Sequence, residues 1–93
     1  MSFQIVISPA ASADVDRLEA WLLDKDPASA IRVGELLETA IASLDELPER
    51  GRASTSTGRE LNVRFGRSTY IVRYRVIERS VVVTRILHGR EDR

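Results

Sequence analysis

Residues 61–77, LNVRFGRSTYIVRYRVI, decide how this chain folds. Apolar residues recur at every second position in 61–65 and again in 70–76, on either side of Gly66-Arg67-Ser68. Side chains of a β-strand alternate between the two faces of a sheet, so this period predicts two strands joined by a tight turn. A further apolar run at 81–87 predicts a third strand, and three strands in succession predict an antiparallel meander.

The alternation also sorts the side chains of this meander onto two faces. One face collects Leu61, Val63, Phe65, Tyr70, Val72, Tyr74 and Val76. The other face carries Arg64, Arg73 and Arg75 beside Ile71 and Ile77, while the facing of Arg85 stays open because both sides of its strand are mostly apolar. Such a mixed face suits a partner that is partly anionic and partly apolar, although an ordinary solvated sheet face is the alternative.

Two helices are predicted before the meander. Ser8-Pro9 and Asp26-Pro27 each join an N-cap residue to the residue favoured in the first helical turn. Apolar residues then recur at helical spacing, as Ala11, Val15, Leu18 and Trp21/Leu22 in the first helix and as Ala30, Val33, Leu37, Ala40/Ile41 and Leu44 in the second. The second helix should end near Leu47, because Pro48 disfavours helical geometry in the preceding residue.

These elements predict an α+β fold in the order β-α-α-β-β-β, with the helical hairpin packed on one face of an antiparallel sheet. Phe3, Ile5 and Ile7 supply the first strand, and residues 48–58 are expected to form a loop without periodicity. The length of 93 residues suits one domain over residues 1–93.

Charged and aromatic residues outside the meander have simple structural interpretations. Trp21 is interpreted as a core residue, or alternatively as a contact at the rim of a groove. The first helix and the following turn carry Asp14, Asp16, Asp24 and Asp26, which are interpreted as caps and solvated charges.

The charge of the chain is divided along its length. Residues 1–47 hold nine acidic and three basic residues, and residues 48–93 hold five acidic and eleven basic residues, so net charges of −6 and +6 cancel. A basic surface facing an anionic partner is one interpretation. Base composition of the genome is the other, because thirteen of the fourteen basic residues are arginine.

Several classes of protein are not indicated by the sequence. It contains no cysteine, and no apolar run approaches the roughly 20 residues that cross a bilayer. The N-terminal MSFQIVISP lacks the pattern of a secretory signal, so a cytoplasmic location is the default expectation. A single histidine and no cysteine leave only carboxylates as further metal ligands, so neither a metal nor any other cofactor is expected.

Several segments, in this order, carry a resemblance to a known family. They are SPAASADVDRLEAWL, DPASAIRVGELLETAIASLDELPERGR, GREL, YIVRYRV and VTRILHGRED. Together they resemble the ParE branch of the RelE/ParE toxins of bacterial type II toxin–antitoxin modules, over nearly the whole chain.

The resemblance implies a toxin that is neutralised by a cognate ParD-like or other small DNA-binding antitoxin. The two would form a hetero-oligomer that reaches operator DNA only through the antitoxin. ParE-type members of the family poison DNA gyrase, whereas RelE-type members cut messenger RNA on the ribosome, and the shared fold does not choose between them.

The residues favour the gyrase toxin over a catalyst. Metal-free RNA cleavage needs a base, an acid and cations for the phosphate. If the chain is a ribonuclease, His88, Arg85, Arg64 and Glu60 are the candidates. However, the only lysine, Lys25, is expected in the helical turn, and Arg93 occupies the position where the ribonuclease branch often has tyrosine.

His88 itself can be explained by a structural role at the end of a strand. For target binding we expect Arg85, His88, Arg90 and Arg93, and for antitoxin binding Trp21, Arg64, Arg73 and Arg75. Two alternatives stay open, the ribosome-dependent messenger ribonuclease and a degenerate toxin that only binds an antitoxin and helps to repress its operon.

Overall fold

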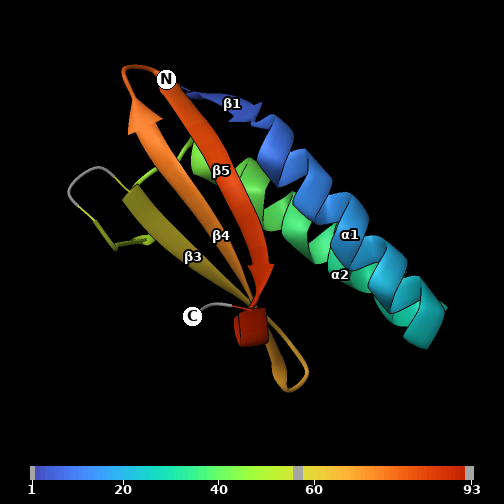
Figure 1. The fold of residues 1–93 in the computed structure, drawn as a ribbon. Coiled ribbons are helices and arrows are strands. Elements are labelled where there is room, and N and C mark those ends of the chain that lie inside the picture. Colours follow the sequence, from blue (N-terminus) through green and yellow to red (C-terminus); the bar gives the residue numbers. More distant parts are fainter. Residues whose placement is uncertain (1, 56–57, 92–93) are drawn as a thin grey trace.

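The computed structural model describes residues 2–55 and 58–91, which form two helices against one face of a five-stranded sheet (Figure 1). The helices are α1 (Pro9–Lys25) and α2 (Pro27–Ala42), with short 3-10 turns η1 (Ser43–Asp45) and η2 (Gly89–Glu91). The strands are β1 (Gln4–Ile7), β2 (Arg52–Ala53), β3 (Gly58–Phe65), β4 (Ser68–Ile77) and β5 (Ser80–His88). The predicted α+β class, with a helical hairpin on one sheet face, is confirmed.

The sheet is mixed, whereas the sequence predicted an antiparallel one. Its strand order is β1-β5-β4-β3-β2, and β1 runs parallel to β5, with Gln4 opposite Ser80 and Ile7 opposite Val83. A parallel pair needs a long crossover connection, which the two helices and the meander supply here. The two-residue strand β2 lies in the segment expected to be loop, because two residues are too few to show any period.

The helices begin where their caps predict and bury one face each. The Ser8 side chain accepts a hydrogen bond from the Ala11 N–H at 3.1 Å, and it donates to the Thr84 carbonyl on β5 at 3.1 Å. The buried side chains of the two helices are Ala11, Asp14, Leu18, Leu22, Ala30, Val33, Leu37 and Ala40. In residues 2–55 and 58–91 no helix is long and apolar enough to cross a membrane.

Two expectations for α1 were wrong. Trp21 is not a core residue, because 52% of it is exposed while its neighbour Leu22 is buried. Asp14 is not a solvated charge, because only 4% of it is exposed. The helical phase explains both outcomes, since positions 11, 14, 18 and 22 lie on one face and position 21 lies at its edge.

A β-bulge at Thr84 explains why the facing of β5 could not be predicted. Tyr74 pairs with Val83, but Arg73 pairs with Arg85, so Thr84 is an extra residue. Its hydroxyl donates to the Arg73 carbonyl at 3.1 Å. The bulge shifts the alternation by one residue, which lets both Val83 and Ile86 face the helices with exposures of 0%.

Tyr74 ties the segment after α2 to the centre of the sheet. Its hydroxyl donates to the Pro48 carbonyl at 2.7 Å and accepts from the Gly51 N–H at 2.8 Å. A Cβ on Gly51 would lie only 2.7 Å from that hydroxyl and 2.8 Å from the Glu60 carbonyl oxygen, so a larger residue would force the two segments apart.

Removing the hydroxyl of Tyr74 should therefore destabilise the fold. Tyr74→Phe leaves the buried Gly51 N–H without its acceptor, and we expect a loss of about 1–3 kcal/mol in the free energy of unfolding, measured by urea denaturation. Tyr70→Phe is the matched control, because Tyr70 is equally buried and its hydroxyl has no hydrogen-bond partner among the described residues. Equal losses in the two variants would contradict this role of Tyr74.

Candidate functional site

The candidate site begins at the part of β5 that no longer pairs with β1. Because β1 ends opposite Val83, the outer edge of β5 beyond that residue faces α1. The Asp14 carboxylate of α1 takes the place of a strand there: Oδ2 accepts the Ile86 N–H at 2.8 Å and the Arg85 Nε–H at 2.7 Å. Oδ1 accepts from Arg85 Nη2 at 3.0 Å and from Arg17 Nη2 at 3.1 Å.

These hydrogen bonds keep Asp14 ionised. Burial on its own would raise the pKa of the carboxyl, but the hydrogen bonds from Arg85, from the Ile86 N–H and from Arg17 outweigh burial and lower the pKa from 3.8 to about 2. The negative charge of Asp14 is therefore balanced by Arg85 and Arg17 within the contact between α1 and β5. Arg85, which the sequence suggested for target binding, is held by this contact.

The same network continues into the C-terminal turn. Arg17, already paired with Asp14, also forms a salt bridge with Glu91 in η2. The other oxygen of Glu91 accepts the N–H of His88 at 2.9 Å. Gly89 allows the turn to pass close to β4, because a Cβ there would lie 3.0 Å from the Thr69 carbonyl oxygen.

His88 is oriented by three contacts. Its Nδ1 accepts a hydrogen bond from the Arg90 N–H at 3.1 Å. Its ring lies edge-on to Tyr70 at 5.1 Å between centroids and tilted to Trp21 at 6.3 Å. A neutral imidazole that accepts at Nδ1 carries its proton on Nε2, so His88 offers a donor on its remaining side.

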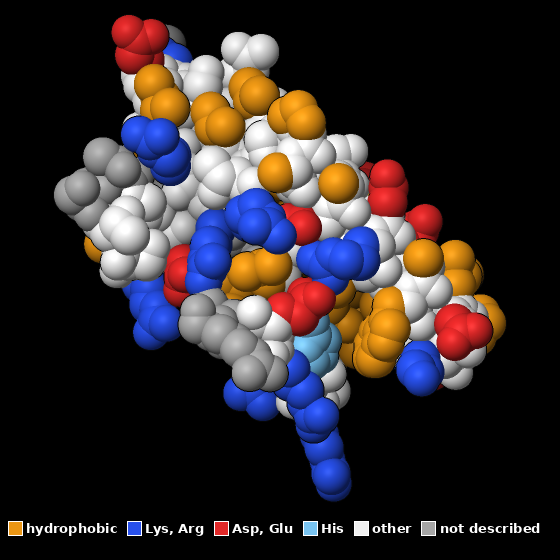
Figure 2. All heavy atoms as spheres, viewed as in Figure 1, with side chains coloured by type: hydrophobic (Ala, Val, Ile, Leu, Met, Phe, Trp, Pro, Cys, Tyr) orange, Lys and Arg blue, Asp and Glu red, His pale blue; other side chains and the backbone are white. Residues whose placement is uncertain are grey.

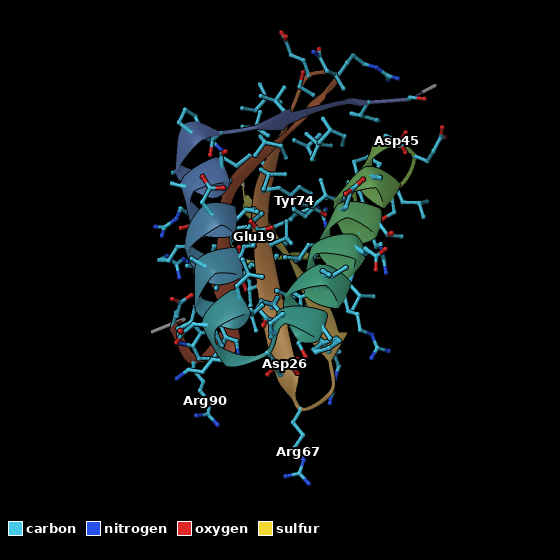
Figure 3. All side chains as sticks on the ribbon, turned by 90° about the vertical axis from the view of Figure 1, so that its right-hand side faces the viewer. Glu19, Asp26, Asp45, Arg67, Tyr74 and Arg90 are labelled. Atoms are coloured by element: carbon cyan, nitrogen blue, oxygen red, sulfur yellow. The ribbon has the colours of Figure 1, made fainter. Side chains whose placement is uncertain are left out.

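A cleft of about 820 Å³ opens beside this histidine. We call it the C-terminal cleft; it is lined by Arg17, Leu18, Trp21, Arg67, Ser68, Thr69, His88, Gly89, Arg90 and Glu91. Figure 3 shows Arg67 and Arg90 extending outward at the same end of the molecule. In Figure 2 the histidine, in pale blue, lies among basic, acidic and hydrophobic side chains. The cleft thus combines an aromatic wall with hydrogen-bond donors.

Comparison with known proteins places the chain in a family. The family described as the ParE toxin of the type II toxin–antitoxin system parDE matches residues 5–93. The chain belongs to the ParE toxin family. It is a toxin of the type II toxin–antitoxin class within the RelE/ParE superfamily.

Two relatives in Caulobacter vibrioides span almost the same length. Toxin RelE1 is 48% identical over the whole of both chains, and Toxin RelE3 is 35% identical over 96% of this chain and 97% of its own.

Two solved structures share the fold of this ParE-family chain. The chromosomal ParDE system from P. aeruginosa superposes with a TM-score of 0.77 at 16% identity, over 92% of this chain and 95% of the other. The RelBE2 toxin–antitoxin complex from Mycobacterium tuberculosis superposes with a TM-score of 0.60 at 23% identity, over 95% and 99%.

The residues suggested for target binding in the ParE-family chain are only partly brought together. His88 and Arg90 both line the C-terminal cleft. Arg85 instead bonds Asp14 at the edge of β5, and Arg93 lies outside the described residues.

The alternative ribonuclease set is divided by the sheet. Glu60 pairs with Arg73 across β3 and β4 and binds its Nε at 2.8 Å, with Arg52 at 3.8 Å on the other oxygen. His88 pairs with Tyr70, whose buried side chain faces the helices. Since successive residues alternate between faces, Glu60 and His88 lie on opposite sides of the sheet.

The residues suggested for antitoxin binding occupy two surfaces. Arg64, Arg73 and Arg75 lie on the sheet face away from the helices, as the alternation predicted. Trp21 lies on the helical side, where Lys25 Nζ sits 5.8 Å from the centre of its ring. The four residues do not form one patch.

Sequence reasoning missed Asp14, Arg17, Arg67 and Glu91. Asp14 could have been found, because it lies three residues after Ala11 and four before Leu18, on the buried stripe. Glu91 carried no comparable signal, because a charged residue near a chain end is usually solvated. Among residues 2–55 and 58–91, no three His, Asp or Glu side chains gather in a way that could hold a metal ion.

The lowered pKa of Asp14 makes stability depend on acid. The ionised Asp14 carboxylate makes its full contribution to the free energy of unfolding above the unfolded pKa of 3.8. This contribution disappears as the pH falls towards about 2, because the unfolded chain takes up the proton first. Asp14→Asn should therefore lose about 2 kcal/mol at neutral pH and show a smaller further loss between about pH 5 and 2.

Urea denaturation across this pH range would measure the effect. Asp16→Asn is the matched control, because its side chain is exposed on the same helix. An acid dependence of the same size in Asp14→Asn and in the unmodified protein would contradict the assignment.

Proposed function

We propose that this chain poisons DNA gyrase by binding it through the C-terminal cleft, without catalysing a reaction, and that a cognate ParD-like antitoxin keeps it inactive. Membership of the ParE toxin family supports the toxin class. The gyrase target rests on the resemblance to the ParE branch and on the chemistry of the cleft.

The hydrogen bond from the Arg90 N–H to Nδ1 of His88 is the observation that carries this proposal. A general base must present a lone pair to the proton that it removes. Here the lone pair of Nδ1 is engaged by the Arg90 N–H, and the Nε2 that remains carries a proton. His88 therefore suits the role of a hydrogen-bond donor to a bound anionic group.

The rest of the C-terminal cleft suits docking as well. Arg67 and Arg90 are exposed at one end of the molecule and supply guanidinium donors. Trp21 adds an exposed aromatic surface of the kind that anchors protein interfaces. A surface that pairs carboxylates or phosphates with an apolar contact would match both features.

We also propose that the antitoxin contacts Trp21 on the helical side and Arg64, Arg73 and Arg75 on the open sheet face. Because these residues lie on two sides of the molecule, the antitoxin segment would have to wrap around an edge of the sheet. Its acidic residues would face Arg64 and Arg75, whose side chains are exposed, while Arg73 already binds Glu60.

A ribosome-dependent messenger ribonuclease is the second candidate. The names of the relatives, Toxin RelE1 and Toxin RelE3, favour it. The C-terminal cleft would then hold RNA, with His88 as the proton-transfer group and Arg67 and Arg90 at the phosphate. In this reading Glu60 could not take part, because it lies on the opposite face of the sheet.

Purified toxin tested against both targets would separate the two candidates. We expect inhibition of supercoiling and accumulation of cleaved DNA with gyrase, and no codon-linked cuts in primer extension on translated messages. Codon-linked cuts without any effect on gyrase at stoichiometric excess would establish the ribonuclease instead. Normal growth after expression without an antitoxin would indicate the degenerate module.

Substitutions of His88 test its role as a donor. Glutamine retains an N–H donor at the end of its side chain but cannot act as a base, so His88→Gln should keep its effect on gyrase within about threefold, whereas His88→Ala should be much weaker. A ribonuclease would lose about 10²–10⁴-fold activity in both variants. The measurement is the toxin concentration that halves supercoiling, with RNA cleavage followed in parallel.

A further inference from the structure

One carboxylate joins α1 to the end of β5. Glu91 lies in η2, three residues after His88, and its Oε1 accepts the His88 N–H at 2.9 Å. Its Oε2 forms the salt bridge with Arg17 of α1. The two oxygens of one side chain are thus bound to elements that are far apart in the sequence.

The α1 end of this link is itself fixed. Arg17 also binds Asp14 Oδ1 at 3.1 Å, and Asp14 holds both the Arg85 guanidinium and the Ile86 N–H. The contacts therefore run without a gap from β5 through the helix and back to the turn that follows β5. A single exposed ion pair contributes little on its own, but a networked pair with a buried anchor is held in one geometry.

The turn at residues 89–91 determines which nitrogen of the His88 ring carries the proton at the C-terminal cleft. With Glu91 bound to the His88 N–H, the chain folds back so that the Arg90 N–H reaches the Nδ1 of the same histidine. That hydrogen bond leaves the proton on Nε2, and the turn also places Arg90 at the rim of the cleft. Without the Glu91 side chain, this turn would lose both its link to Arg17 of α1 and its hydrogen bond to the His88 N–H.

We propose that Glu91 is a positioning residue, which acts through Arg17 and the His88 N–H to fix the tautomer of His88 and the place of Arg90. The proposal rests on the proposed function of the C-terminal cleft. Glu91 is acidic and would itself repel an anionic partner. In this proposal it is nevertheless needed for binding that partner, because it positions the groups that make the contact.

The state of the His88 ring provides a test that does not depend on the target. At about pH 8 the nitrogen chemical shifts of a neutral imidazole distinguish a proton on Nε2 from one on Nδ1. We expect the unmodified protein to show the Nε2–H form alone, and Glu91→Ala to show a mixture of both forms. Glu91→Gln, which can still accept from the His88 N–H, should stay closer to the unmodified protein.

Activity and stability complete the experiment. Glu91→Ala should weaken the effect on gyrase about tenfold, because its docking groups are no longer held in place, while the midpoint of urea unfolding stays nearly unchanged. Glu35→Ala, an exposed glutamate on α2, is the matched control and should change neither property.

The possible outcomes separate the positioning role from the proposed target. An unchanged His88 tautomer in Glu91→Ala, or gyrase inhibition within twofold of the unmodified protein, would overturn the role of Glu91. If the unmodified toxin has no effect on gyrase, the proposed function fails, but the tautomer shift still tests whether Glu91 positions His88. If Glu91→Ala weakens gyrase inhibition and also clearly lowers the midpoint of urea unfolding, the role of Glu91 is structural, and this result would also overturn the proposal.

Discussion

The contact between the Asp14 carboxylate and the edge of β5 joins the two layers of this molecule. β1 pairs with β5 only as far as Val83, which leaves the Ile86 N–H at the strand edge without a strand acceptor. A buried N–H without a partner costs about 1–3 kcal/mol. Asp14 supplies the acceptor from α1, and Arg85 and Arg17 balance the charge that is thereby buried.

This contact depends on the bulge at Thr84. Without the extra residue, strict alternation after Val83 would bring Arg85 onto the face that the helices cover and send Ile86 to the other face. With the bulge, Ile86 packs in the core and Arg85 can reach Asp14 around the edge of the strand. Together, the short β1, the bulge and the buried aspartate therefore allow the parallel pairing of β1 and β5 to end without leaving the Ile86 N–H unpaired.

The elements with uninterrupted periods could be predicted from the sequence, and those that depend on an irregularity could not. The residues of β3 and β4 that face the helices recur at every second position, and Ser8-Pro9 gives a complete helix start, so these features follow from local rules. The parallel pairing of β1 joins it to β5, a strand distant in the sequence, and the four residues of β1 carry no local signal for that partner. The apolar residues of β5 change phase at Thr84, which looked like a strand without a preferred face.

The site was less predictable than the fold for the same reason. Residue type alone singled out His88 and the arginines, but their partners are set by the three-dimensional arrangement. The sequence suggests Arg85 for target binding and Arg73 for antitoxin binding, and the structure gives each a carboxylate partner, Asp14 and Glu60 respectively. Trp21 resembled a core residue because it lies one position away from the buried Leu22, a difference of about 100° around the helix.

The turn that follows the last strand decides the chemistry that His88 can offer. For His88 to act as a base towards the C-terminal cleft, its Nδ1 would have to donate to a carbonyl or carboxylate so that Nε2 kept its lone pair. The carboxylate nearest in the chain is that of Glu91, but its two oxygens bind the His88 N–H and Arg17. The Arg90 N–H occupies Nδ1 instead, which leaves Nε2 as a hydrogen-bond donor. The direction of that one hydrogen bond therefore sets which ring nitrogen of His88 can donate and which can accept at this end of the fold.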